Sequence, residues 1–183
     1  PLVSIVFNST QIHSHLIGLY NANNINAAIT IGHYFGVTDD QIKVAIESYI
    51  PENNRSQLLT KGSNEIILDA YNANPSSMKV ALENFIQLEK SSKIIIIGDM
   101  FELGDESANE HKAIVNQLIS EGDVDCYFVG NDFYANKIEK ENFHFYPTFE
   151  SFSDHLKEVN FTNKMILIKG SRGMALERTL EFL

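Results

Sequence analysis

The chain has 183 residues, of which 44% are hydrophobic and 21% charged, a composition typical of a folded globular protein and not of a disordered one. Its formal net charge of -10 argues against nucleic acid as a partner, and its one cysteine, Cys126, excludes an internal disulfide and favours the cytoplasm. The longest aliphatic run, Ile94–Ile97, is too short to cross a bilayer, so no membrane association is expected.

The N-terminal part predicts two strands followed by two helices. Pro1 leads directly into strand-like sequence, so no signal peptide is expected, and the missing initiator Met suggests that the chain begins inside a longer protein. Alternating apolar residues predict a hairpin or two edge strands over residues 1–17, and apolar residues at helical spacing predict a helix over 21–35. Thr38 is expected to cap a second helix over 41–49. Two strands and two helices bury little apolar surface, which suggests the end of a truncated domain.

A regular alternation of strands and helices follows a polar linker at residues 52–57. Alternation at this spacing is typical of βαβ units with a mostly parallel sheet. We therefore predict a Rossmann-like α/β domain over residues 53–183, with helices on both faces of the sheet. The predicted strands are 65–68, 93–97, 126–129, 143–146 and 165–168, and the predicted helices are 76–89, 107–120, 132–140, 149–159 and 173–183.

Polar loops follow four of the predicted strands, where ligands bind in open α/β sheets. The loop Gly130–Asp132 is interpreted as an ordinary polar connection. The other three, Asp69–Asn74, Gly98–Gly104 and Lys169–Gly173, carry residue types that suit ligand binding. They are the candidate site.

Two of these loops suggest binding of an anion and of a ribose. Lys169 and Arg172 stand ahead of a predicted helix and could bind a carboxylate or phosphate, although Arg172 could instead pair with Glu177 on the surface. Asp69 could accept hydrogen bonds from a ribose diol. The alternative, a cap of the next helix, is weakened because Pro75 lies later and offers its own helix start.

The acidic and histidine residues leave alternatives open. Asp99 and Glu102 could bind a cation or an ammonium group, or could cap and solvate their loop. His111 either orients that loop or lies on the surface. His13 and His15 alternate on a predicted strand without a third ligand, so no metal site is expected.

Two nucleotide-binding motifs are missing from the sequence. No Gly-Lys-Thr or Gly-Lys-Ser occurs, so the chain holds no P-loop for a nucleoside triphosphate. A dinucleotide-binding oxidoreductase domain would carry G-x-G-x-x-G after its first strand, where Asp69–Asn74 stands instead.

Four stretches resemble motifs of the Mur ligase family. Gly18–Ala28 is similar to the family motif G-x-[HY]-N-x-x-N-x-x-A-A, with a Tyr where many members have His. Asp69–Met78 resembles D-x-Y-N-A-N-P-x-S-M. Gly98–Gly104 and Lys169–Arg172 resemble G-D-M-x-E-L-G and K-G-S-R. The last three are typical of the branch that joins D-alanyl-D-alanine to UDP-N-acetylmuramoyl-tripeptide.

The resemblance implies an ATP-dependent, three-domain ligase of cytoplasmic peptidoglycan precursor synthesis. Such a ligase activates the tripeptide carboxylate as an acyl phosphate with ATP and Mg²⁺, and the amine of the dipeptide then attacks. Residues 1–52 would be the end of the central α/β ATPase domain, and 53–183 the C-terminal domain. The P-loop, the Mg²⁺ ligands and a modified lysine would lie in the missing N-terminal and central domains. The chain alone is therefore expected to be inactive and to hold no catalytic residue.

The resemblance also implies a role for each matching position. The expected nucleotide ligands are Asn21 and Asn24 at the adenine, Asp69 at the ribose and Arg55 near the nucleotide. The expected ligands of the dipeptide are Asn72, Asn74, Asp99, Glu102, Lys169, Ser171 and Arg172.

Two further alternatives compete with this interpretation. The chain could belong to a different branch of the Mur ligase family, or could be a non-catalytic Rossmann-like binding domain, which would leave its polar loops unexplained. Whether the third residue of the tripeptide is lysine or diaminopimelate is not encoded here, because the absent domains are expected to read that end.

Overall fold

The computed structural model describes residues 2–90, 92–122 and 124–183. The chain forms two compact units, a first unit of residues 1–57 and a second unit of residues 58–183. Their boundary falls at the end of the polar stretch 52–57 that the sequence indicates as a linker. None of the helices formed by the described residues is long and apolar enough to cross a membrane.

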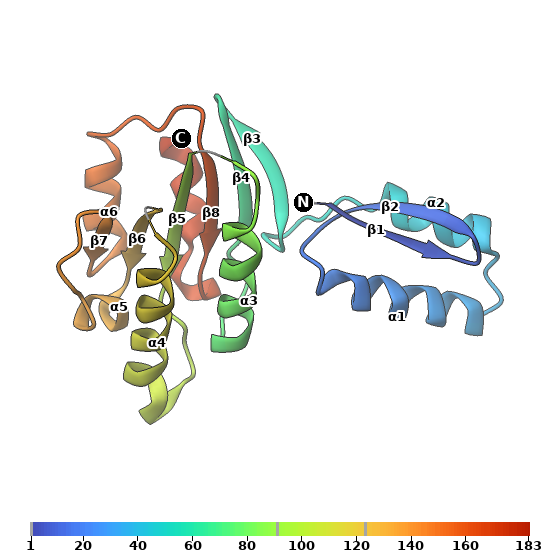
Figure 1. Cartoon of the computed structure of the whole chain (residues 1–183), viewed down its shortest axis with the longest axis horizontal. Helices are drawn as coiled ribbons and strands as arrows, with labels where there is room; N and C mark the ends of the chain where they lie inside the picture. The colour runs from blue at the N-terminus through green and yellow to red at the C-terminus, as the bar shows by residue number, and fades with distance from the viewer. Residues whose placement is uncertain (1, 91, 123) are drawn as a thin grey trace. The chain divides into compact units, whose positions relative to one another are not determined.

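The first unit consists of a hairpin and two helices (Figure 1). Strands β1 (Leu2–Phe7) and β2 (Thr10–Ile17) pair antiparallel, as the alternating sequence predicts. Helices α1 (Asn21–Tyr34) and α2 (Asp39–Ser48) follow, and both contact the hairpin. Thr38 caps α2 in a capping box, which confirms the predicted cap. The small core consists of Val3, Ile12, Ile25, Ile29 and Ile42.

The second unit is built on a six-stranded sheet with the order β3-β4-β8-β5-β6-β7. The pairs β4–β8, β8–β5, β5–β6 and β6–β7 are all parallel, so the predicted mostly parallel α/β sheet is confirmed. The sequence prediction missed β3, an edge strand that a short turn at Gly62 joins to β4. The strands are β3 (Gln57–Lys61), β4 (Asn64–Asp69), β5 (Lys93–Gly98), β6 (Asp125–Val129), β7 (Phe143–Tyr146) and β8 (Met165–Lys169).

Two of the predicted helices in this unit differ from the structure, one in length and one in type. The helix predicted over 132–140 ends at Ala135, because beyond the buried Phe133 the segment has no apolar face to pack. The segment 173–183 is not α-helical but forms two short 3-10 helices, which the left-handed backbone of Ala175 separates (φ 48°). The observed helices are α3 (Pro75–Ile86), η1 (Gly104–Glu106), α4 (Ser107–Ile119), α5 (Asn131–Ala135), α6 (Phe149–Leu156), η2 (Arg172–Met174) and η3 (Leu176–Phe182).

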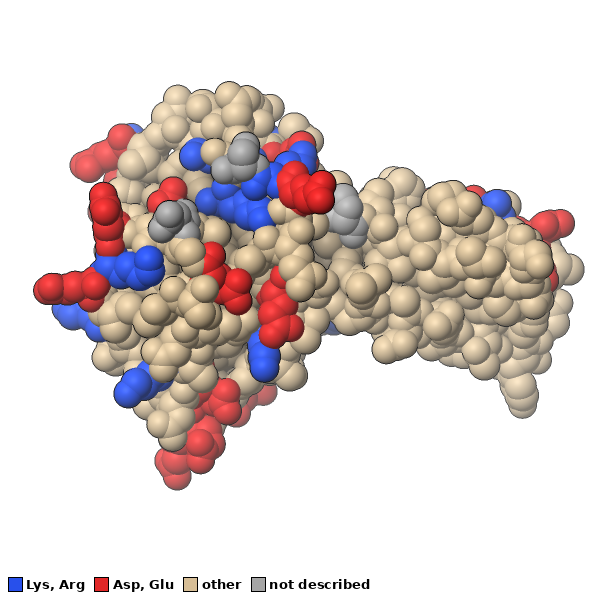
Figure 2. Space-filling model, viewed as in Figure 1, with Lys and Arg blue, Asp and Glu red and all other residues tan. Residues whose placement is uncertain are grey.

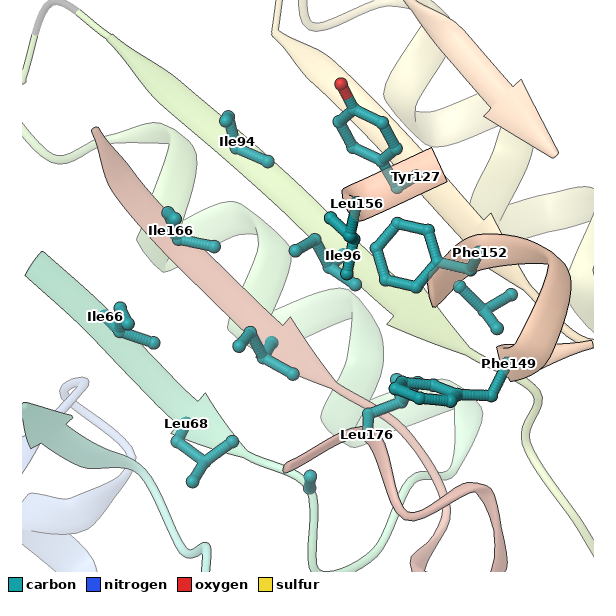
Figure 3. Packing of buried hydrophobic residues seen from close by; sticks show 13 residues of the cluster. Ile66, Leu68, Ile94, Ile96, Tyr127, Phe149, Phe152, Leu156, Ile166 and Leu176 are labelled. Carbon is teal, nitrogen blue, oxygen red and sulfur yellow. The ribbon is translucent and has the colours of Figure 1, made fainter. Parts of the chain in front are cut away.

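Both faces of the sheet are covered, because successive residues of each strand point to opposite sides. Tyr127 of β6 packs against Phe152 of α6, whereas the next residue, Phe128, packs against Phe133 of α5. Figure 3 shows the α6 side, where isoleucines of the central strands meet the aromatic side chains of α6 and Leu176. Burial on both faces, complete in β8 and complete after the first residue in β5, explains the continuous apolar runs in the sequence.

The last strand of the chain, β8, lies in the middle of the sheet between β4 and β5. Asp69 at the end of β4 is directly opposite Lys169 at the end of β8, and Lys169 is also opposite Ile97 of β5. The loops that leave these three strands therefore begin at the same edge of the sheet, which is the edge where α/β proteins bind ligands.

Candidate functional site

An ion pair stands at the centre of this edge. Lys169 Nζ lies 2.6 Å from Asp69 Oδ2 and also donates to the carbonyl oxygen of Asn72, at 3.2 Å. The Lys169 side chain is only 2% exposed and that of Asp69 17% exposed. The cation that the sequence assigns to a substrate anion is thus bonded within the protein.

The loop after β5 is tied to its neighbours through its own backbone. The N–H of Phe101 donates to Ser171 Oγ at 2.9 Å, and the N–H of Ser171 donates to the carbonyl of Asp99 at 3.2 Å. The N–H of Met100 donates to Nε2 of His111 at 3.0 Å. Because Nε2 accepts, the proton of this neutral imidazole is on Nδ1, which donates to the carbonyl of Ser107 at 2.7 Å. His111 is completely buried and orients the loop, so its surface alternative is wrong.

Asp99 turns inward from the same loop. Its carboxylate accepts the N–H groups of Asp132 and Phe133, both at 3.0 Å, at the start of α5. Burial raises the pKa of the Asp99 carboxyl above its ordinary value of 3.8, although these two N–H groups and the nearby His111 act in the opposite direction. The predicted substrate contact of Asp99 stays a prediction, and the observed bonds make it a brace between two loops.

The loop Gly130–Asp132 is more than the ordinary connection suggested by the sequence. Because Gly130 has no side chain, the Asp99 carboxyl group can lie directly against its backbone. Gly130 has φ +129°, and a Cβ there would lie 2.2 Å from the Asp99 carboxyl group. Only glycine combines this backbone with this approach.

Asp99, His111 and Asp132 bring oxygen and nitrogen atoms within 4.8 Å of one another, the spacing of metal ligands. Both Asp99 oxygens already accept backbone N–H groups, and Nε2 of His111 accepts the N–H of Met100. Asp132 Oδ2 accepts from Ser107 Oγ at 2.9 Å, so each of the three residues takes part in hydrogen bonds within the protein that account for the cluster.

The exposed part of the edge combines a cation with two aromatic rings. The Arg172 guanidinium lies over the Tyr71 ring, 5.1 Å from its centroid. Phe101 is 44% exposed and packs close to Gly173, where a Cβ would lie 2.7 Å from the Phe101 ring. The sequence prediction did not include Tyr71 and Phe101, although both stand inside the motif stretches. Glu102, also exposed, has a left-handed backbone (φ 65°), which is unusual for a residue with a side chain.

The two asparagines after β4 lie on the same edge. Asn74 caps α3, since its Oδ1 accepts the N–H of Ser77 at 2.9 Å, and α3 begins at Pro75 as the sequence indicates. Asn72 Oδ1 accepts the N–H of Ala73, at 2.9 Å. Both asparagines remain exposed, and their contact with a substrate stays a prediction.

In the first unit, the predicted adenine ligands form one hydrogen-bonded group. Asn21 is buried and donates to the carbonyl of Ile17 at 2.7 Å, and its Oδ1 accepts from the exposed Asn24 at 2.8 Å. Asn21 therefore orients Asn24. Tyr20, which follows the loop glycine of this motif, has its hydroxyl 2.7 Å from Ser56 Oγ. This bond ties the motif to the segment around Arg55, and the nucleotide roles of Asn24 and Arg55 stay predictions.

Comparisons with known proteins give a consistent result. Residues 54–172 match the protein family described as Mur ligase, glutamate ligase domain. The chain is 32% identical over 175 residues to the UDP-N-acetylmuramoyl-tripeptide–D-alanyl-D-alanine ligase of Bacillus subtilis, a match that covers 91% of this chain and 38% of the relative.

Solved structures with the same fold include two ligases. The crystal structure of MurF from Acinetobacter baumannii has a TM-score of 0.81 and 27% identity, and the match covers 94% of this chain and 39% of that chain. The MurF ligase from Thermotoga maritima in complex with ADP has a TM-score of 0.78 and 21% identity, with 99% and 42% covered. The chain thus spans less than half the length of these proteins.

Proposed function

Because the chain belongs to the Mur ligase family, we propose that it is part of an ATP-dependent ligase that joins D-alanyl-D-alanine to UDP-N-acetylmuramoyl-tripeptide. The reaction would make a precursor of peptidoglycan in the cytoplasm. The second unit would bind the incoming dipeptide, and the first unit would be the end of the domain that binds ATP. The relative from Bacillus subtilis, whose name states this reaction, supports the choice of branch.

One observation carries the proposal: the three motif loops of the second unit are bonded to one another at a single edge of the sheet. D-Alanyl-D-alanine is a zwitterion, so its site needs a cation for the carboxylate and an anion for the ammonium group. Arg172 and Glu102 are exposed residues of opposite charge on two of these loops. An Arg fork suits a carboxylate, and the rings of Tyr71 and Phe101 offer apolar surface for the methyl groups.

The nucleotide would be shared between this chain and the rest of the protein. Asn24 offers an amide to the adenine, Asp69 a carboxylate to the ribose and Arg55 a positive charge. ATP, with Mg²⁺, supplies the phosphoryl group that activates the tripeptide. The sequence holds no P-loop for the phosphates, so residues 1–183 alone should neither hydrolyse ATP nor form the amide bond. ATP hydrolysis by purified residues 1–183 would contradict this part of the proposal.

The substrate assignment is tested on the full-length protein by phosphate release with ATP and UDP-N-acetylmuramoyl-tripeptide. We expect release that depends on D-alanyl-D-alanine and not on L-alanine or D-glutamate. Turnover that prefers one of these single amino acids would place the protein in a different branch of the family, and nucleotide binding without turnover on any amine would favour a non-catalytic binding domain.

The dipeptide site is tested with Arg172→Ala. Loss of one charged hydrogen-bond donor costs about 1.5–3 kcal/mol, so the KM for the dipeptide should rise roughly 10- to 100-fold while the KM for ATP changes little. Arg178→Ala is a matched control, because Arg178 also lies over an aromatic ring, that of Phe149, but belongs to η3. An equal KM for the dipeptide in both variants would show that Arg172 does not bind the dipeptide.

A further inference from the structure

Lys169 is a charged side chain of the candidate site that solvent hardly reaches. It is 2% exposed, and buried lysines are rare because the ammonium group loses its hydration unless other groups replace it. Here Asp69 and the carbonyl of Asn72 take the place of water. A substrate arriving from solvent would have to displace these bonds before it could reach the ammonium group.

Both acceptors of Lys169 belong to the segment that leaves β4. Asp69 is the last residue of that strand, directly opposite Lys169 in the parallel register, and Asn72 lies in the following loop. One ammonium group thus holds a carboxylate oxygen and the loop backbone at the same time. Without it, the Asp69 carboxylate and the Asn72 carbonyl would each lose a charged hydrogen-bond donor.

The two residues that follow Lys169, Gly170 and Ser171, are held in place by contacts with Leu176 and with the end of β5 and its loop. A Cβ on Gly170 would lie 2.9 Å from the Leu176 side chain and 3.3 Å from the Gly98 backbone, so β8 leaves the sheet in close contact with β5. Ser171 then bonds to the backbones of Asp99 and Phe101. The position of Lys169 is therefore set by the packing around β8.

We propose that Lys169 is a positioning residue of the nucleotide site, which orients the Asp69 carboxylate toward the ribose, and that it does not contact the dipeptide. The inference rests on the proposed function, which puts the ribose at Asp69. It replaces the anion-binding role that the sequence suggests for Lys169 and leaves Arg172 as the cation for the substrate carboxylate. Lys169 acts only through Asp69 and its loop.

A double-mutant cycle tests this inference in the full-length protein, with Mg-ADP affinity as the measurement. The variants are Asp69→Asn, Lys169→Met and the double variant, and Lys164→Met is the control because Lys164 lies just before the opposite end of β8. Removal of a residue that orients a metal ligand typically costs about 10- to 100-fold in affinity, and we expect Lys169→Met to weaken ADP binding by a similar factor. The double variant should bind ADP no more weakly than Asp69→Asn, and Lys164→Met should bind like the wild type.

Some outcomes would overturn the inference. Multiplying effects of Asp69→Asn and Lys169→Met would mean that Lys169 touches the nucleotide itself, and unchanged ADP affinity in Asp69→Asn would leave nothing for Lys169 to position. A raised KM for D-alanyl-D-alanine in Lys169→Met, with unchanged ADP affinity, would make Lys169 a dipeptide ligand. If Lys169→Met fails to fold, the comparison of the double variant with Asp69→Asn decides alone. The double variant removes both charges, and Asp69→Asn leaves the Lys169 ammonium group the amide oxygen of the new asparagine and the carbonyl of Asn72 as acceptors.

The ADP measurement is independent of the amine that the enzyme uses. If the wild type binds ADP but shows no phosphate release that depends on D-alanyl-D-alanine, the substrate assignment fails. The cycle on ADP affinity then still supports or contradicts the role of Lys169.

Discussion

The two units of the chain differ in how much of their apolar side-chain surface is buried. In the second unit β8 is buried from end to end, β5 and β6 are buried beyond their first residue, and large aromatic side chains such as Phe128 and Phe152 are completely inaccessible. In the first unit only one side of the hairpin and helices contributes to a core. Its exposed large apolar residues are Leu2, Val6, Leu19, Tyr20, Ile31, Tyr34, Phe35, Val37, Val44, Tyr49 and Ile50.

Charge follows the same division. Residues 1–38 contain no Asp, Glu, Lys or Arg. Figure 2 shows charged side chains spread over the visible face of the second unit, whereas most of the visible face of the first unit has none. Large exposed apolar surface without charge is uncommon for a protein part that meets water. The second unit thus has a core of its own with both faces of its sheet covered, whereas the first unit keeps much of its apolar surface exposed. We therefore expect the first unit to depend more on packing partners than the second.

Separating the units should have the largest effect. We expect residues 58–183 alone to unfold cooperatively on heating, because their sheet is covered on both faces. Residues 1–57 alone should show no cooperative transition, since a segment of this size with a one-sided core cannot offset its conformational entropy. Circular dichroism melts of the two segments measure this. A cooperative transition in residues 1–57 would contradict the contrast between the units.

Gly130→Ala should damage the second unit most among single substitutions. The new Cβ would meet the Asp99 carboxyl group at 2.2 Å on a backbone that alanine rarely adopts, and the buried carboxylate would lose its N–H partners. Backbone strain and a buried charge with lost partners together cost about 4 kcal/mol in the free energy of unfolding, measured with urea on residues 1–183.

Gly62→Ala is the matched control for this substitution. Gly62 also has a positive φ, +59°, but nothing lies within 4 Å of the added Cβ. Its cost should stay near 1 kcal/mol, that of a left-handed alanine. Equal losses for both variants would show that the contact with Asp99 does not matter.

Acidification should lower the free energy of unfolding of the second unit through protonation of His144, by less than Gly130→Ala does. Burial, with the nearby His155, lowers the pKa of His144 below its ordinary value of 6.5, whereas Asp125 acts in the opposite direction. The unfolded chain therefore binds this proton first. The stability contribution of neutral His144 is fully present above pH 6.5 and is lost as the pH falls through the lowered pKa.

The measurement is the free energy of unfolding of residues 1–183 from about pH 7.5 to about pH 5.5. His144→Gln should lose less stability on acidification than the wild type, while His15→Gln, an exposed change in the hairpin of the first unit, should keep the wild-type slope. A slope that His144→Gln leaves unchanged would assign the acid effect to other groups.

Most of the fold could be predicted because local patterns and tertiary structure agree. The run Ile94–Ile97 is apolar at every position, as a strand buried on both faces requires. Thr38 and Pro75 mark helix starts that the structure contains. β3 was missed because it is a short, half-exposed edge strand that has little apolar pattern to reveal it. The left-handed turn at Ala175 has no glycine to signal it, so the sequence predicts one continuous helix at the end of the chain.

The sequence predicts at which edge of the sheet the candidate site lies, but not which of its side chains contact one another. The rule that ligands bind beyond the ends of parallel strands identified the loops that carry Asp69, Asp99 and Lys169. Which of these side chains turn inward depends on the strand order, and nothing in the sequence shows that β8 enters between β4 and β5. That insertion puts Lys169 opposite Asp69. The burial of Asp99 likewise depends on the space at Gly130, a long-range contact.

The smallest expected effect tests the exposed apolar surface of the first unit. Ile31 on α1 is 59% exposed, so Ile31→Lys should change the free energy of unfolding of residues 1–183 by no more than about 0.5 kcal/mol, as surface substitutions do. Ile119 on α4, 43% exposed, is the matched isoleucine of the second unit, and Ile119→Lys should be equally neutral.

In the full-length protein the two variants should differ. If the first unit is the end of a larger domain, Ile31 packs there against residues outside this chain, and a lysine in its place would leave a charge in an apolar contact. Ile31→Lys should then lower the melting temperature and the yield of soluble protein, whereas Ile119→Lys should not. Neutral behaviour of Ile31→Lys in the full-length protein would mean that α1 keeps this face in solvent. The exposed apolar surface of the first unit would then not indicate packing against residues outside this chain.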